Sequence, residues 1–237
     1  MRVVLFDIDG TLLTTGGAAR GAFARALSEA AGHPIDPAGY SFSGKTDPQI
    51  ARDILEANGV GGERLAGCIE ASIRLYLKYF EAERPRLEQA RLLPGVRELL
   101  DALAEREGVH TALLTGNVEQ GARIKLGHFG ITGYFDFALS CFGSDDSDRY
   151  RLPALAVVRA QGRLGTDFEG RQLVIVGDSK HDVLCGRSVR ARAVAVGTGW
   201  TPAATLRALG PDAFLEDLSH TGRALAAILD GDGAAAR

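Results

Sequence analysis

Residues 3–11, VVLFDIDGT, decide the fold, because they join a short apolar strand to two closely spaced carboxylates. An uninterrupted apolar run of this length is typical of a strand buried on both faces. Similar runs recur along the chain, and most intervals between them have helical spacing. The runs lie at residues 3–6, 111–114, 136–139, 173–176 and 193–196. This alternation predicts an α/β fold with a parallel sheet and helices on both of its faces.

Residues 15–91 follow a different pattern. They lack a strand-like run and instead contain three segments with helical spacing, at residues 18–31, 48–58 and 63–82. A helical block between the first and second strands predicts a second, smaller domain with hinges at residues 14–17 and 91–95. We therefore expect a core of residues 1–14 and 92–237 and an inserted helical domain of residues 15–91.

The composition of the chain excludes several classes of protein. Its 237 residues are 46% hydrophobic and 24% charged, which excludes intrinsic disorder. A net charge of −3 disfavours a nucleic-acid partner. The three cysteines have no metal-binding spacing, and the start of the chain has no apolar stretch long enough for a signal or membrane helix. We expect a soluble cytoplasmic protein, a monomer or homodimer, with no membrane or nucleic-acid partner.

Chemically reactive residues follow three of the predicted strands. They are residues 7–11 (DIDGT), 115–117 (TGN) and 177–182 (GDSKHD). In an open parallel sheet, ligands bind at the carboxyl ends of the strands. The three segments therefore predict one site.

The acidic residues of these segments predict a metal site. Asp7 and Asp9 are two residues apart on a strand and point to the same face. Asp178 and Asp182 are four residues apart at a helix start and face one crevice. An all-oxygen site of this kind suits Mg²⁺. At Thr115, a hydroxyl meets free backbone N–H groups at a helix start, which predicts an anion site.

Together these segments resemble the haloacid dehalogenase-like superfamily, and within it the phosphatases that have a helical cap inserted after the first strand. The resemblance rests on residues 5–12 (LFDIDGTL), 113–117 (LLTGN) and 175–178 (IVGD) with Asp182. It implies a Rossmann-like catalytic core and a cap, residues 15–91, that sets substrate specificity. Within this branch the chain resembles phosphoglycolate phosphatase.

The resemblance also implies a role for each site residue. Asp7 is then the nucleophile and Asp9 the general acid and base. Mg²⁺ lies between Asp7, the backbone carbonyl of Asp9 and Asp178, with Asp182 as a further ligand or an anchor. Phosphoryl oxygens are held by Thr115 and the amide of Gly116, and Asn117 adds a substrate contact.

The chain departs from the family in one respect. Relatives usually have a lysine between the second and third segments, where it pairs with the nucleophile. This chain has four lysines, and none lies between Lys125 and Lys180. We expect an arginine to replace it, since a guanidinium contacts two oxygens at once. Arg149 is the first candidate and Arg151 the second.

Residues 39–46, GYSFSGKT, fit the pattern of a phosphate-binding P-loop. The context disfavours a P-loop, because prolines in residues 33–37 exclude a central strand before it. We expect Asp47 to be the N-cap of the next helix and Pro48 its first residue. The resemblance implies instead that Lys45 and Thr46 belong to a cap loop that contacts the substrate.

These observations predict a Mg²⁺-dependent phosphatase that hydrolyses a small phosphorylated metabolite through an aspartyl-phosphate intermediate. The first alternative is a phosphomutase of the same fold. A P-loop nucleotide-binding protein and a non-catalytic phospho-ligand-binding protein are the remaining alternatives.

Overall fold

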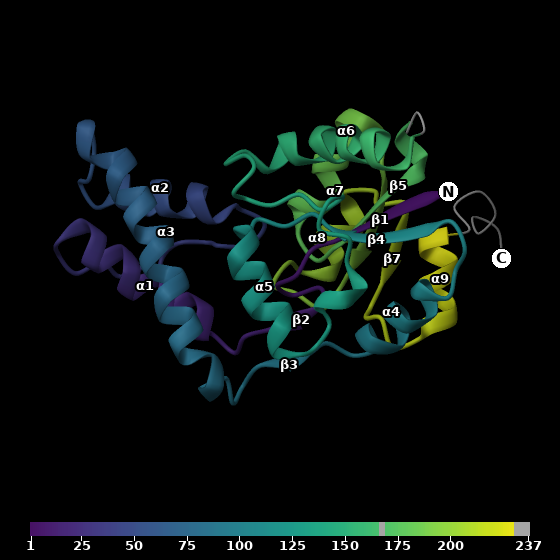
Figure 1. Cartoon of the computed structure of the whole chain (residues 1–237), viewed down its shortest axis with the longest axis horizontal. Coiled ribbons are helices and arrows are strands. Elements are labelled where there is room, and N and C mark those ends of the chain that lie inside the picture. Colours follow the sequence, from purple (N-terminus) through teal and green to yellow (C-terminus); the bar gives the residue numbers. More distant parts are fainter. Residues whose placement is uncertain (166–168, 230–237) are drawn as a thin grey trace.

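Five parallel strands form the central sheet of the computed structural model, which describes residues 1–165 and 169–229 (Figure 1). The register pairs Phe6 with Leu113 on one side and with Val176 on the other, so three strands end side by side. In spatial order the strands are β4 (Val109–Leu113), β1 (Arg2–Phe6), β5 (Leu173–Gly177), β6 (Arg192–Val196) and β7 (Ala213–Leu215).

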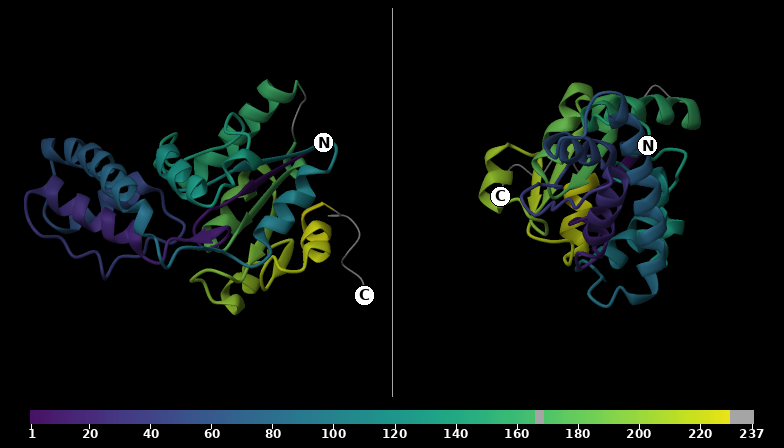
Figure 2. Two further views of the ribbon diagram at one scale, coloured as in Figure 1. Left: turned by 60° about the horizontal axis from the view of Figure 1, so that its bottom comes forward. Right: turned by 90° about the vertical axis from the view of Figure 1, so that its left-hand side faces the viewer.

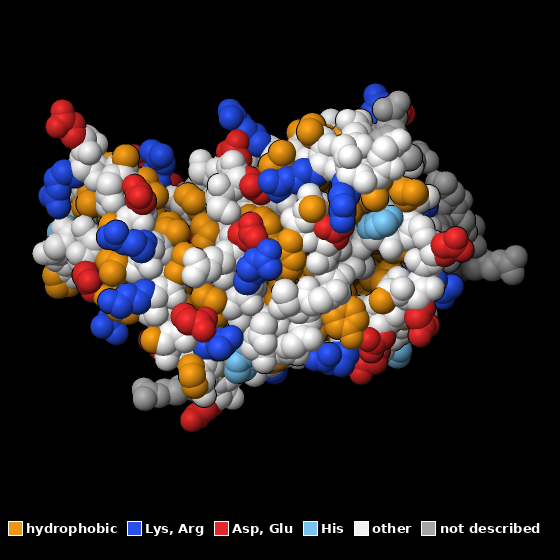
Figure 3. All heavy atoms as spheres, viewed as in Figure 1, with side chains coloured by type: hydrophobic (Ala, Val, Ile, Leu, Met, Phe, Trp, Pro, Cys, Tyr) orange, Lys and Arg blue, Asp and Glu red, His pale blue; other side chains and the backbone are white. Residues whose placement is uncertain are grey.

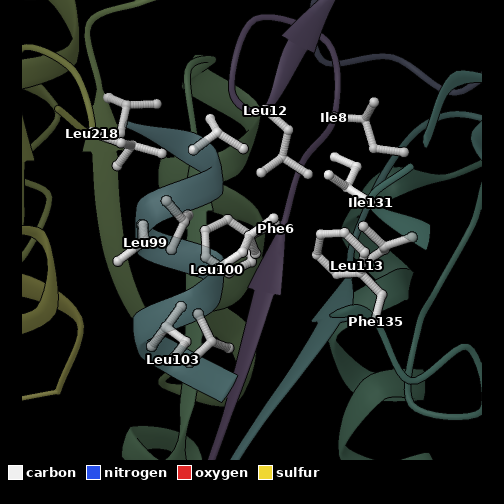
Figure 4. Close-up of a cluster of buried hydrophobic side chains, with 14 of the residues drawn as sticks. Phe6, Ile8, Leu12, Leu99, Leu100, Leu103, Leu113, Ile131, Phe135 and Leu218 are labelled. Atoms are coloured by element: carbon white, nitrogen blue, oxygen red, sulfur yellow. The ribbon is translucent and has the colours of Figure 1, made fainter. Parts of the chain in front are cut away.

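Helices cover both faces of this sheet. Phe6 points to one face, where it packs with helices α4 (Val96–Ala104), α5 (Glu119–His128) and α9 (Thr221–Leu229). Figure 4 shows the leucines of α4 beside Phe6 and Leu12. Leu5 points to the other face and packs with α6 (Leu152–Leu164) and Cys185 of α7 (Lys180–Cys185). The short helix α8 (Ala203–Ala208) packs beside α7. The predicted α/β fold is confirmed.

Three helices form a separate group beyond the carboxyl ends of the strands (Figures 1 and 2). They are α1 (Ala18–Ala31), α2 (Asp47–Ala57) and α3 (Glu63–Glu83), and we call them the helical segment. Their apolar faces pack against one another rather than against the sheet, around Phe23, Ile54 and Phe80. Ile124 of α5 also belongs to this cluster, so α5 contacts both groups of helices.

The chain enters and leaves the helical segment through two short strands that pair with each other. Leu13 of β2 (Leu13–Thr14) lies opposite Leu92 of β3 (Arg91–Leu92) in an antiparallel ribbon. The sequence predicts hinges at these positions, and the structure adds that the two connections are hydrogen-bonded neighbours.

Two predictions about local structure were wrong. Residues 136–139 form a turn, in which the amide of Leu139 donates to the carbonyl of Asp136, and β4 is instead continued by a single bridge between Leu114 and Cys141. The N-cap of α2 is Thr46 rather than Asp47, because the Thr46 hydroxyl accepts from the amide of Gln49. The predictions also omitted β7 and α9.

The surface carries charges of both signs. On the face drawn in Figure 3, basic and acidic side chains are interspersed. Within the described part of the chain, every helix is too short or too polar to cross a lipid bilayer.

Candidate active site at the carboxyl ends of the strands

Asp7 lies directly after β1 and at the centre of the site. Its amide donates to the carbonyl of Val176 at 2.9 Å, and it is only 6% exposed. Because β4 and β5 flank β1, Thr115 and Asp178 follow the neighbouring strands at the same edge of the sheet. The structure therefore brings together the three sequence segments that predicted one site.

Three buried carboxylates lie close together at this edge. One oxygen each from Asp7, Asp178 and Asp182 lies within 4.8 Å of the others. The pKa of Asp7 is raised to about 6: burial raises it most, the Arg149 guanidinium lowers it, and the carboxylates of Asp182 and Asp9 also raise it. Burial, with Asp182 and Asp7, also holds the pKa of Asp178 well above its usual range. Such a cluster favours a bound cation, which removes the repulsion between the charges.

The donor set fits a hard divalent cation, since all of its atoms are carboxylate oxygens. Asp178 has one oxygen engaged, because its Oδ1 accepts from the Thr11 hydroxyl at 3.1 Å. Both oxygens of Asp182 are engaged: Oδ1 accepts from Arg149, and Oδ2 accepts from the amide and hydroxyl of Ser179 at 2.9 and 2.7 Å. Asp182 is therefore better suited to anchor the site than to coordinate an ion.

Arg149 supplies positive charge beside the carboxylates. Its Nη2 lies 3.2 Å from Asp7 Oδ1 and donates to Asp182 Oδ1, while the residue is 2% exposed. The Nε atom of Arg149 is buried without a hydrogen-bond partner among the described residues. By contrast, the side chain of Arg151 is 74% exposed and pairs with surface carboxylates. Of the two candidates, Arg149 therefore lies beside Asp7, whereas Arg151 lies on the surface.

Asp9 is held by a lysine that the sequence analysis missed. Lys125 of α5 is 4% exposed, and its Nζ lies 2.6 Å from Asp9 Oδ2 and 2.6 Å from Asn117 Oδ1. Asn117 Nδ2 also donates to Asp9 Oδ2, at 2.8 Å. One oxygen of Asp9 thus accepts from two side chains, whereas Oδ1 accepts from none of the described residues.

The Thr115 hydroxyl accepts two hydrogen bonds from Asn117, one from its amide at 3.3 Å and one from Nδ2 at 2.8 Å. Its own hydrogen is therefore free to be donated to a ligand. Asn117, predicted as a substrate contact, uses its side chain to fix Thr115, Asp9 and Lys125. Gly116 meets the helical segment so closely that a Cβ atom there would lie 2.0 Å from the carbonyl oxygen of Lys45.

The loop before α2 is docked on this part of the site. The amide of Asp47 donates to the carbonyl of Gly116 at 2.8 Å, and its Oδ2 accepts from the amide of Val118 at 2.9 Å. The Thr46 hydroxyl donates to the carbonyl of Ser147 at 2.7 Å, and Lys45 Nζ pairs with Asp53 at 2.6 Å. Both predicted substrate contacts of this loop are thus engaged with protein groups. Residues 36–46 contain no strand, which argues against the P-loop alternative.

A cavity of about 350 Å³ lies between the sheet and the helical segment. We call its core side the polar floor, which consists of Asp7, Asp9, Thr115, Gly116, Asn117, Lys125, Arg149 and Asp178. The opposite side comes from the helical segment and the loops that join it. The arrangement brings the buried Asp7 carboxylate and Arg149 guanidinium together with the partly exposed Asp9 carboxylate around one small volume.

Comparisons with known proteins agree with this geometry. A family model described as haloacid dehalogenase-like hydrolase matches residues 1–190. The phosphoglycolate phosphatase of Agrobacterium fabrum is 29% identical over 248 residues, covering 99% of this chain and 96% of that protein. The pyrophosphatase PpaX of Halalkalibacterium halodurans is 25% identical over 227 residues, covering 92% and 94%. In fold, the chain is similar to CbbY from Rhodobacter sphaeroides in complex with phosphate, with a TM-score of 0.71, 20% identity and coverage of 94% and 96%.

Proposed function

Because the chain belongs to the haloacid dehalogenase-like hydrolases, we propose that it is a Mg²⁺-dependent phosphatase that acts on a small phosphomonoester through an aspartyl-phosphate on Asp7. The predicted family and class of enzyme, a hydrolase of the phosphatase type, are confirmed. The metal, the intermediate and the substrate are proposals. The observation that carries them is the buried Asp7 carboxylate, 3.2 Å from Arg149, at the strand end shared with Thr115 and Asp178.

In the first step, a carboxylate oxygen of Asp7 attacks phosphorus while the bond from phosphorus to the leaving oxygen breaks. The Thr115 hydroxyl and the unpartnered Nε of Arg149 donate to phosphoryl oxygens, which stabilises the negative charge of the transition state. Protonated Asp9 donates its proton to the leaving oxygen from Oδ1, the carboxylate oxygen that accepts no hydrogen bond from Lys125 or Asn117.

In the second step, a water molecule attacks the phosphorus of the aspartyl-phosphate, and the bond from phosphorus to Asp7 breaks. Asp9, now ionised, takes the proton from this water and returns to its starting state. Because two donors hold Asp9 Oδ2, Oδ1 serves in both steps without rotation of the carboxylate.

The metal would be held by Asp7, Asp178 and the backbone carbonyl of Asp9, and Asp182 would anchor Arg149 and Ser179 beside it. When bound, Mg²⁺ would neutralise phosphoryl charge and keep Asp7 ionised. We further propose that residues 15–91 act as a cap over a core of residues 1–14 and 92–237, of which residues 166–168 and 230–237 lie outside the described residues. The separate apolar cluster of the helical segment and the shared cavity support this division.

Steady-state release of inorganic phosphate tests the proposal. Wild-type protein with Mg²⁺ is expected to hydrolyse members of a panel that includes an aryl phosphate, phosphoglycolate and pyrophosphate. Asp7→Asn is expected to lower the rate by at least roughly 10⁴-fold, because an amide is a poor nucleophile. Circular dichroism checks that the variant is folded. Unchanged turnover in Asp7→Asn would refute the proposed intermediate, and transfer of phosphate between substrate hydroxyls without release would favour the phosphomutase alternative.

A further inference from the structure

The side of the cavity that faces the polar floor includes three aromatic rings. Phe23 of α1 has ring-centroid distances of 5.7 Å to Phe42 and 5.0 Å to Tyr76 of α3. All three residues line the cavity, and we call them the aromatic wall. Ile50 of α2 extends its apolar surface.

The cations on this side are engaged by groups of the helical segment itself. Among the described residues, the segment and its loops contribute Arg20 and Lys45 to the cavity lining. Lys45 is neutralised by Asp53 at 2.6 Å. Arg20 lies 4.4 Å over the ring of Phe42, and its Nη2 donates to two backbone carbonyl oxygens, at 2.6 and 3.1 Å. A substrate carboxylate would have to compete with these contacts.

Trp200 lies at the edge of the same cavity, on the loop that follows β6. It is 72% exposed, and it is the chain's one tryptophan. A large exposed ring at the edge of a buried site offers a flat surface for stacking.

The hydroxyl of Tyr76 adds one polar group to the aromatic wall. Tyr76 is 1% exposed, and its hydroxyl has no hydrogen bond within the described part of the chain. Burial, together with the nearby carboxylates of Asp47 and Asp9, raises the pKa of Tyr76 well above its usual range. The hydroxyl therefore keeps its proton and remains available as a donor.

We propose that the substrate's leaving group is an aromatic or comparably flat apolar alcohol, which packs on the aromatic wall and Trp200 and accepts a hydrogen bond from Tyr76. This inference rests on the proposed phosphatase function and specifies its substrate class. A cavity of about 350 Å³ lies in the range of sites that enclose larger ligands, whereas the two-carbon leaving group of phosphoglycolate would leave most of it unfilled. The leaving oxygen would still lie over the polar floor, within reach of Asp9.

Binding of non-hydrolysable phosphonates to the whole wild-type protein tests this inference separately from turnover. All three ligands carry a phosphonate group. Benzylphosphonate adds an aromatic ring, phosphonoacetate adds a carboxylate, and methylphosphonate adds neither. Calorimetry with Mg²⁺ is expected to show benzylphosphonate binding at least about tenfold more tightly than both others. Quenching or enhancement of Trp200 fluorescence should accompany only the aromatic ligand.

Two variants connect the preference to the cavity. In Trp200→Ala and Phe42→Ala, the preference for benzylphosphonate over methylphosphonate should fall to less than about threefold. Val158→Ala is the control, because Val158 is 63% exposed on α6 and does not line the cavity, and it should keep the full preference.

If phosphonoacetate bound more tightly than benzylphosphonate, and this preference were abolished in Arg20→Met, the inference would be overturned in favour of a carboxylate-bearing substrate. Phosphate release from the monoester panel without any aromatic preference in binding would refute this inference and leave the phosphatase proposal intact. Absence of both phosphonate binding and hydrolysis would refute the two together.

Discussion

The polar floor and the aromatic wall face each other across one cavity, and they hold their side chains by different means. On the floor, Asp9, Lys125 and Asn117 fix one another through hydrogen bonds of 2.6–2.8 Å. On the wall, Phe23 and Tyr76 are held by packing. Directional bonds fix atoms that must meet a reacting phosphoryl group, whereas apolar contact selects by shape and tolerates variation. Under the proposed function, the chemistry falls to the polar floor and selectivity to the aromatic wall together with Trp200.

Arg149→Ala is the most severe test of this contrast. Removing the guanidinium leaves Asp7 and Asp182 buried without their cation. We expect a loss of kcat/KM of about 10³-fold and of about 3–5 kcal/mol in the free energy of unfolding. Phosphate release and urea unfolding measure the two effects. Arg151→Ala is the matched control and should change the rate by less than about twofold, because its side chain is 74% exposed. Full activity in Arg149→Ala would show that another residue supplies the charge.

Lys125→Met tests whether the floor positions the general acid. A displaced Asp9 should matter most for poor leaving groups, which need protonation. We expect kcat to fall by about 10²–10³-fold for alkyl phosphates and by less than about tenfold for 4-nitrophenyl phosphate.

A merely structural role for Lys125 would lower both rates equally, so equal losses would contradict the assignment. Lys78→Met is the control, because Lys78 is an exposed residue of α3, and it should leave both rates unchanged.

The pH dependence of metal binding tests the carboxylate cluster. The pKa of Asp7 is raised to about 6 in the folded protein, above its usual value of about 4. The protonated form is thus favoured by folding, and the stability of the metal-free protein should decline as the pH rises from about 4 through 6. Mg²⁺ needs the ionised form, so it should raise the melting temperature by several degrees at pH 8 and little at pH 5. Differential scanning calorimetry measures this, and a larger shift at pH 5 would contradict it.

Lys45→Met has the smallest expected effect. Its Nζ already pairs with Asp53 at 2.6 Å, and the two side chains are 30% and 35% exposed. We expect kcat/KM to change by less than about threefold and the unfolding free energy by less than about 1 kcal/mol. A loss of kcat/KM above tenfold would indicate that Lys45 contacts the substrate, with a cation beside the aromatic wall. ATP binding that depends on Lys45 would revive the P-loop alternative.

The sequence predicted the strand ends well because apolar runs and acidic residues are local signals. Asp7, Thr115 and Asp178 follow β1, β4 and β5 as expected, and the sheet order makes them neighbours. The strand predicted at residues 136–139 was wrong because Phe137 and Leu139 pack against the core from a turn, so the run is apolar without being a strand. The three-residue β7 is too short to give a clear periodic signal.

Lys125 was missed because the lysine expected from the resemblance pairs with Asp7, whereas Lys125 lies shortly after the second segment and pairs with Asp9. A signal was nevertheless present. Val118 and Ala122 precede Lys125 by seven and three residues, and this helical spacing places the lysine on the buried face of α5. The partner of such a lysine depends on tertiary contacts that spacing does not reveal.

The position of Ile124 has a consequence for how this enzyme can diversify. Although it belongs to a helix of the core, its side chain is part of the apolar cluster of the helical segment, which includes Phe23, Ile54 and Phe80. If residues 15–91 from a relative were grafted onto this core, their apolar side chains would therefore pack poorly against Ile124 of α5. A functional chimera has to exchange the facing residues of α5 together with the insertion. Lys125 follows Ile124 in the chain, so these exchanges must keep the contact of Lys125 with Asp9.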